Sequence, residues 1–205
     1  MLTIYHAPRT RAFRVIWGCE ELGIDYTLVK VDFSPEYRAT PEWRALNPVG
    51  KVPVMHDGDL TMFESGAMLQ YVLDRYGEGR LQPAPGSHEH ALYLQWSWFA
   101  ESTFARPLGE IVNHKRTFGD DVIPSVIDEM KARAALSLTA IDDAVANREY
   151  LLGDHFTGAD IMMGYTVMLA EMMLDGDMPA HATAYWQRLQ ARPALAATRA
   201  AEASM

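Results

Sequence analysis

The stretch Asn47-Pro48-Val49-Gly50-Lys51-Val52-Pro53-Val54, together with the hairpin that follows it, decides the fold of this chain. Two short runs, 52–56 and 60–63, are rich in residues that favour strands. Asp57-Gly58 lies between them and predicts a two-residue hairpin turn, because both residue types tolerate a positive φ angle. We therefore expect a loop, a strand, a tight turn and a second strand.

Pro53 and Ser65 give this stretch features of a binding site. A proline removes a ladder hydrogen bond, so Pro53 belongs at a sheet edge or a strand start and leaves the backbone of Val52 free for an extended ligand. Ser65 occupies the N-cap position of a helix that runs to Gly77, and a helix N-terminus attracts carboxylates. Lys51 adds a cation. An ordinary hairpin followed by a capped helix would explain the same residues.

The residues before this stretch predict a crossover unit. A strand is expected at 2–6, a helix at 11–22, a strand at 26–33 and a helical turn after Pro41. Strand, helix and strand in this order form a right-handed parallel crossover. With the hairpin and its helix, they predict a four-stranded mixed sheet covered by helices, which is an α/β thioredoxin-like domain over residues 1–80.

The rest of the chain is predicted to be helical. Residues 81–86 contain turn residues without periodicity and indicate a linker. An all-α domain is expected at 87–205. Thr157 and Asp160 form a capping-box pattern before an almost wholly apolar helix. The expected long helices cover 88–109, 124–145 and 158–174.

The composition excludes several classes of protein. Of the 205 residues, 49% are hydrophobic, which is enough for a substantial core, but no apolar run approaches the ~20 residues that span a bilayer. The net charge of −9 argues against nucleic acid or an anionic membrane as a partner. The single cysteine excludes an internal disulfide framework. The first 15 residues do not resemble a signal peptide, and a cytoplasmic protein is expected.

The run from Asn47 to Val54, followed after a short hairpin by Glu64-Ser65, resembles the glutathione-binding signature of the cytosolic glutathione transferases. The similarity extends from Met1 to about Ala191. The resemblance implies a thioredoxin-like domain followed by an all-α domain that forms an electrophile pocket and a dimer interface. It also implies a homodimer with glutathione as co-substrate and no metal.

The resemblance assigns roles to the residues of the signature. Pro53 is expected to follow a cis peptide bond, and Val52 to pair its backbone with the cysteinyl part of glutathione. Glu64 and Ser65 are expected to hold the γ-glutamyl end, and Lys51 to lie near the glycyl carboxylate.

Three residues compete to stabilise the glutathione thiolate. Thr10-Arg11 stands where related bacterial and fungal members have Ser-Arg, so the Thr10 hydroxyl could donate to the sulfur and Arg11 could supply charge. Thr10 could equally be a plain N-cap. Tyr5 ends the first strand, as in tyrosine-type members, but it could also be a core aromatic residue. The sequence favours Thr10 and Arg11. Cys19 lies on the apolar side of a helix and is not expected to be a nucleophile.

The expected activity is attack of the thiolate on a small apolar electrophile, or reduction of an organic hydroperoxide. The alternative is a glutathione-binding or regulatory protein without turnover. Phe104, Arg106 and His114 are expected near the electrophile, and Glu101 near the neighbouring subunit. An isomerase of the zeta type would need a Ser-Ser-Cys loop that this chain lacks.

Overall fold

The computed structural model describes residues 1–204, which form two compact units. The first contains residues 1–80 and 191–204, and the second contains residues 81–190. The first unit is interrupted after Arg80 and resumes at Ala191. The C-terminal segment does not belong to the helical domain in which the sequence analysis placed it, because its helix packs against the first helix of the chain.

A four-stranded mixed sheet forms the centre of the first unit. Its order is β2-β1-β3-β4, with β1 parallel to β2 and the other pairs antiparallel, as the sequence predicts. Asp57 pairs with Leu60, so the hairpin turn is Gly58-Asp59 and not Asp57-Gly58. The second strand is shorter than expected. The strands are β1 (Leu2–His6), β2 (Tyr26–Lys30), β3 (Val54–Asp57) and β4 (Leu60–Phe63).

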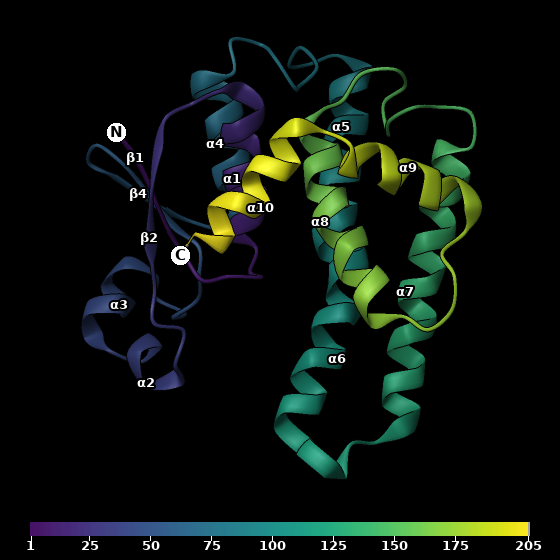
Figure 1. Cartoon of the computed structure of the whole chain (residues 1–205), viewed down its shortest axis with the longest axis horizontal. Helices are drawn as coiled ribbons and strands as arrows, with labels where there is room; N and C mark the ends of the chain where they lie inside the picture. The colour runs from purple at the N-terminus through teal and green to yellow at the C-terminus, as the bar shows by residue number, and fades with distance from the viewer. Residues whose placement is uncertain (205) are drawn as a thin grey trace. The chain divides into compact units, whose positions relative to one another are not determined.

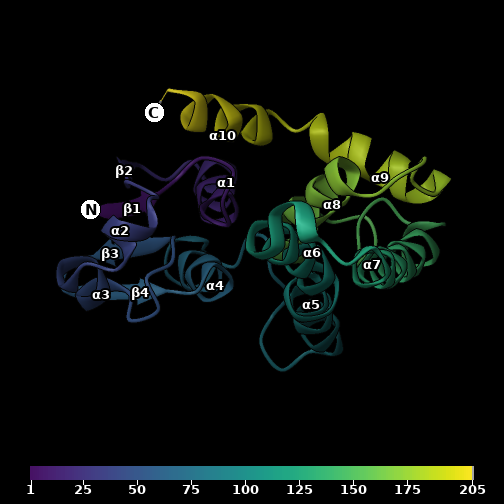
Figure 2. The ribbon, with the colours of Figure 1, turned by 90° about the horizontal axis from the view of Figure 1, so that it is seen from below.

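Three helices lie side by side on one face of this sheet, as Figure 1 and Figure 2 show: α1 (Ala12–Leu22), α4 (Ser65–Tyr76) and α10 (Pro193–Ala203). Every residue of α1 from Ala12 to Cys19 is buried, because α1 packs against both other helices and the sheet. The short helices α2 (Pro35–Arg38) and α3 (Pro41–Leu46) follow β2. The sequence predicts only the second of them, as a helical turn after Pro41.

The two faces of β1 have different surroundings. Ile4 and His6 are buried, while Tyr5 between them is half-buried and points to the opposite face, as alternate residues of a strand do. On that face Tyr5 packs against a cluster that contains Trp43 of α3 and Val54 of β3. The sheet therefore has a core on each side.

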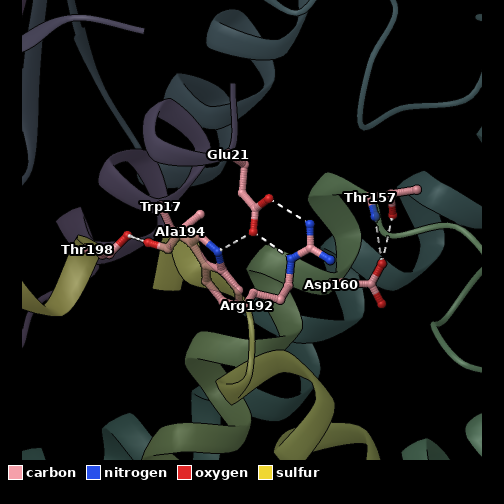
Figure 3. Close-up of polar contacts among 7 residues, drawn as sticks. All are labelled: Trp17, Glu21, Thr157, Asp160, Arg192, Ala194 and Thr198. Atoms are coloured by element: carbon pink, nitrogen blue, oxygen red, sulfur yellow. Dashed lines mark hydrogen bonds and ion pairs between the residues drawn. The ribbon is translucent and has the colours of Figure 1, made fainter. Parts of the chain in front are cut away.

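A hydrogen-bonded ion pair fixes the C-terminal segment to α1, as Figure 3 shows. Arg192 donates from Nε to Glu21 Oε1 over 2.6 Å and from Nη2 to Glu21 Oε2 over 2.7 Å. Trp17 Nε1 donates to Glu21 Oε1 over 2.9 Å. A bidentate arginine–carboxylate pair is among the stronger charged contacts in proteins. It holds the chain at the point where α10 begins.

The second unit is helical. The predicted helix 88–109 is divided into two α-helices by a π-helical segment, which sequence periodicity does not reveal. The region from Gly158 to Val167 in the central helix is wholly buried, as its apolar composition predicts. The elements are α5 (His88–Trp98), η1 (Phe99–Phe104), α6 (Ala105–Phe118), η2 (Gly119–Asp121), α7 (Pro124–Val145), α8 (Gly158–Met173) and α9 (Ala180–Gln190).

The predicted capping box is present at the start of α8. Thr157 donates its backbone N–H to Asp160 Oδ2 over 2.8 Å, and Figure 3 includes this contact. Asp160 Oδ1 also accepts from Leu151 N, at 3.0 Å, and from Tyr185 Oη, at 2.9 Å. Burial raises the pKa of Asp160, although these donors act in the opposite direction. Within residues 1–204, no helix has the length and hydropathy to cross a membrane.

Candidate functional site

Asn47 shapes the loop before β3 from inside. It is buried, and its Nδ2 donates to the carbonyl of Lys51 over 2.9 Å while its Oδ1 accepts from Val49 N over 3.1 Å. The backbone N–H of Gly50 closes the turn on the Asn47 carbonyl over 2.8 Å. An asparagine that bonds to its own loop fixes a turn without help from a strand. Lys51 is thereby held with its side chain exposed.

Gly50 allows the same loop to lie close to a neighbouring one. Its φ is +62°, and a Cβ added there would lie 2.4 Å from the carbonyl oxygen of Arg38. Arg44 fills the remaining space, donating to that carbonyl over 3.1 Å and to the carbonyl of Pro48 over 2.7 Å. Only glycine fits this conformation and this distance.

Val52 and Pro53 follow directly, and the bond between them is cis, as the sequence analysis predicts. Pro53 precedes β3, which begins at Val54. Val52 is half-buried. Within the described part of the chain, neither the N–H nor the C=O of Val52 takes part in a backbone–backbone hydrogen bond. The backbone of Val52 is thus an open donor and acceptor beside a sheet.

The junction of β4 and α4 has an unusual backbone. Glu64 is the N-cap of α4 and has φ +78° and ψ +103°, which is a strained conformation for a residue other than glycine. Ser65 is the first residue inside the helix, not the N-cap expected from the sequence. Such strain is found most often at ligand-binding sites. The amides of Ser65 and the next residues point out of the helix N-terminus.

Arg14 contacts Ser65 from α1. It is fully buried, and its Nη1 donates to Ser65 Oγ over 3.3 Å. A hydroxyl that accepts this bond keeps its own hydrogen for another acceptor. Of the three arginines near the start of α1, Arg9 is exposed, Arg11 is half-buried, and only Arg14 lies in the core. In the sequence, the feature that indicates the burial of Arg14 is its position among the apolar residues of α1.

Thr10 is oriented differently from the expectation. Its Oγ1 donates to the carbonyl of Ala7 over 2.7 Å, so its only hydroxyl hydrogen is already used. It is not the N-cap of α1, because that position belongs to Arg11, which makes no side-chain cap bond. Arg11 is half-buried. Both residues lie in the turn that leads into α1.

Tyr5 lies on the far face of the sheet from α1. Its ring centroid is 6.2 Å from that of Trp43 and 5.1 Å from that of His56. These contacts are those of a core aromatic residue, which was one of the two roles considered for it.

Cys19 is buried in α1, and burial raises the pKa of its thiol to about 12. A thiol with such a pKa is almost entirely protonated near neutral pH and is a poor nucleophile. The position agrees with the sequence analysis, which gave Cys19 no role in catalysis.

A cavity of about 920 Å³ lies in the second unit between η1, α6 and α7. Of the residues expected at an electrophile pocket, Arg106 and His114 line it, whereas Phe104 is fully buried and does not. His114 Nε2 accepts from the backbone N–H of Ile123 over 2.9 Å, so this imidazole also fixes the connection to α7. Glu101 is half-buried in η1 and is not among the lining residues.

Comparison with known proteins shows the family of the chain. Residues 1–74 match the family model described as the glutathione S-transferase N-terminal domain. Glutathione S-transferase 4 of Zea mays is 33% identical over 88% of this chain and 83% of its own length. The chain therefore belongs to the glutathione S-transferase family.

Two solved structures extend the comparison to almost the whole chain. Glutathione transferase URE2P8 from Phanerochaete chrysosporium, solved with oxidized glutathione, has a TM-score of 0.90 and 26% identity, with 99% of this chain and 95% of that chain covered. A theta class glutathione S-transferase from Xanthomonas axonopodis pv. citri, solved with glutathione bound, has a TM-score of 0.81 and 30% identity, with 96% of each chain covered.

Proposed function

We propose that this protein is a glutathione transferase that binds glutathione along Val52 and at the start of α4. The backbone of Val52 pairs with the cysteinyl part as an added strand would. Glu64 and Ser65 hold the γ-glutamyl end, and Lys51 lies near the glycyl carboxylate. The absence of a backbone partner for Val52 among residues 1–204 and the strained conformation of Glu64 support this assignment.

The hydrogen bond from Arg14 to Ser65 carries the proposal. Because Ser65 Oγ accepts from Arg14, its hydrogen and the first amides of α4 remain available to a carboxylate. The buried guanidinium adds positive charge beneath them. An anionic ligand group is what this arrangement favours.

Calorimetry with glutathione tests this assignment. Ser65→Ala is expected to weaken binding by roughly tenfold or more, since a hydrogen bond to a charged group contributes about 1.5–3 kcal/mol. Ser125→Ala is the control, because Ser125 is an exposed serine in the first turn of α7. Equal glutathione affinity in the wild-type protein and Ser65→Ala would contradict the proposal.

Thr10 and Arg11 are our first choice for stabilising the thiolate. The thiolate then attacks the electrophile, a carbon–sulfur bond forms, and the leaving group departs with its electron pair. For this role the Thr10 hydroxyl must turn from the Ala7 carbonyl to the sulfur. Arg11 and the N-terminus of α1 lower the pKa of a nearby thiol by their positive potential. Tyr5 is the third candidate.

Kinetics separate these candidates. Conjugation of 1-chloro-2,4-dinitrobenzene and reduction of cumene hydroperoxide are measured for the wild-type protein and for Thr10→Ala, Arg11→Gln and Tyr5→Phe. We expect Thr10→Ala to lose turnover while it keeps its glutathione affinity, and Thr10→Ser to retain activity. A loss confined to Tyr5→Phe would move the catalytic role to Tyr5.

The second candidate function is glutathione binding without turnover, in a regulatory protein. The bond from Thr10 to Ala7 favours it, because this hydroxyl has no hydrogen left for a sulfur in this arrangement. Tight glutathione binding together with failure on both substrates would support this alternative.

We also propose a homodimer in the cytoplasm, with no metal in the reaction. The helix α5 exposes large apolar side chains, of which Trp98 is 67% exposed, and such groups are usually covered by a partner. Glu101 in the adjoining segment would then lie near the neighbouring subunit. Light scattering at micromolar concentration tests the dimer, and a mass near 23 kDa would contradict it.

A further inference from the structure

His6 and Glu202 form a buried pair of titratable side chains that the proposed function does not use. His6 is the last residue of β1 and is fully buried, and Glu202 lies in the last turn of α10 with a side chain that is 13% exposed. His6 Nδ1 lies 3.8 Å from Glu202 Oε1. Burial lowers the pKa of His6 and raises the pKa of Glu202, because it disfavours the charged form of each.

The placement of this pair destabilises the fold. Neither ring nitrogen of His6 nor Oε1 of Glu202 has a hydrogen-bond partner within residues 1–204. Buried polar groups without such a partner are rare in native proteins and call for an explanation. The buried residues of α10, Leu195 and Thr198, lie seven and four positions before Glu202 and share its helix face. An apolar residue at position 202 would suit that face better.

The other end of α10 is fixed to α1. Arg192, directly before the helix, forms the bidentate pair with Glu21 that Figure 3 shows. The helix has 11 residues, so it extends about 16 Å from this pair to its last turn. The carboxylate of Glu202 is therefore held against the end of β1 by a helix whose start is fixed.

The chain turns directly after His6. Arg9 has φ +61°, a left-handed conformation that is uncommon for a residue with a side chain. Thr10 Oγ1 closes the turn on the Ala7 carbonyl over 2.7 Å. The N–H and the positive charge of Arg9 lower the pKa of Glu202, against the effect of burial. Glu202 thus interacts with the residue before the turn and with the strained residue inside it.

We propose that Glu202 is a positioning residue for the transferase reaction: it holds the turn 7–10, which leads to the residues that stabilise the thiolate. This inference rests on the proposed function, in which those residues are Thr10 and Arg11. Glu202 acts through the backbone of the turn, whereas glutathione is bound along Val52 and at Ser65. Removal of the Glu202 carboxylate should therefore change the reactivity of bound glutathione and leave its affinity unchanged.

Limited proteolysis of the free full-length protein tests whether Glu202 holds the turn. Trypsin cleaves after arginine, and Arg9 is exposed. We expect Glu202→Ala to release the peptide 1–9 roughly fivefold faster than the wild-type protein, because cleavage follows the population of the open turn. The controls are cleavage after Arg116 in the second unit and the variant Glu36→Ala on the exposed helix α2. An unchanged rate of release would overturn the proposal, whether or not the protein is a transferase.

Kinetics with 1-chloro-2,4-dinitrobenzene test the consequence for the reaction. Glu202→Ala is expected to lower kcat roughly tenfold, since a misplacement of about 1 Å can cost about 100-fold in rate. The affinity for glutathione, measured by calorimetry, should stay within about twofold. The pKa of the bound thiol, read from the pH profile of kcat, should rise. A loss of affinity with an unchanged kcat would contradict a positioning role.

Glu202→Gln keeps the shape of the side chain and one acceptor oxygen. It should fall between Glu202→Ala and the wild-type protein in both tests, and it replaces Glu202→Ala if that variant does not fold. If the wild-type protein conjugates the substrate and neither variant differs from it, the transferase assignment stands and the role of Glu202 is refuted. If the wild-type protein has no turnover, the transferase assignment fails, and the role of Glu202 in the reaction fails with it.

Discussion

In the first unit, the groups around Val52 and Ser65 are braced by buried neighbours: Asn47 holds the loop, and Arg14 holds the serine hydroxyl. In the cavity of the second unit, Arg106 has no described partner and is exposed. Braced groups suit a ligand of constant shape, since their geometry is fixed before binding. Substitution of an exposed side chain has little effect on folding. A site built from such side chains can therefore be altered to suit a different ligand.

The largest expected effect concerns the buried thiol of Cys19. Burial raises its pKa from 9.0 to about 12, so the thiolate fraction near neutral pH falls about a thousandfold. We expect the native protein to react slowly with 5,5′-dithiobis(2-nitrobenzoate) at pH 8, and the rate to rise with pH toward 12 while the fold persists. The unfolded protein in urea is the control. Rapid reaction of the native protein at pH 8 would show that Cys19 is accessible.

Asp160→Ala tests how much the buried hydrogen bonds to Asp160 stabilise the second unit. The change leaves the N–H groups of Leu151 and Thr157 and the hydroxyl of Tyr185 without their acceptor. Each buried group left unsatisfied costs about 1–3 kcal/mol, so we expect a loss of about 4 kcal/mol in the free energy of unfolding. Urea unfolding measures it, with Asp143→Ala on the exposed face of α7 as control. A loss no greater than that of the control would contradict the role given to Asp160.

Gly50→Ala and Gly58→Ala form a matched pair in the first unit. Both glycines have a positive φ, near +60°, but only at Gly50 would a new Cβ meet a backbone atom, at 2.4 Å. Both variants should lose about 1 kcal/mol from the strained φ, and Gly50→Ala about 2 kcal/mol more from the clash. Thermal unfolding compares them, and calorimetry should show weaker glutathione binding only in Gly50→Ala. Equal stability of the two variants would mean that the loop can move away.

Glu21→Gln breaks the charge of the pair with Arg192 while keeping the shape of the side chain. Glu21 is 7% exposed, so we expect a loss of about 1–2 kcal/mol and faster proteolysis within 191–204. Glu36→Gln, on the exposed helix α2, is the control. Unaltered proteolysis would show that α10 is held by its apolar contacts alone.

Arg106→Gln should give the smallest change in stability, below about 0.5 kcal/mol, because the side chain is exposed and has no described partner. The substitution is expected to change the affinity for a ligand and not the stability of the fold. A stability loss above about 1 kcal/mol in urea unfolding would remove the contrast between the two sites.

Particular residues show what the sequence could predict. The hairpin, the helix that begins at Ser65 and the helix 124–145 follow from local periodicity, and the structure confirms them, although the hairpin turn lies one residue later than its sequence predicts. The hydrogen bonds of Thr10 to Ala7 and of Arg14 to Ser65 do not follow, because they depend on how a buried helix lies against its neighbours. The helix predicted at 88–109 is interrupted by a π-helical segment, in which each hydrogen bond spans one residue more than in an α-helix. The spacing of apolar residues does not reveal this change.

The return of residues 191–204 to the first unit has a consequence for synthesis on the ribosome. The strands of the sheet are translated before the second unit, but α10, which packs on α1, is translated after it. The 110 residues of 81–190 must be translated in between, which takes about 6–22 s at 5–20 residues per second. During that interval the face of α1 that includes Trp17 lacks its final cover, so the second unit can be complete before the first. A nascent chain arrested before residue 191 would therefore present this apolar face to a chaperone.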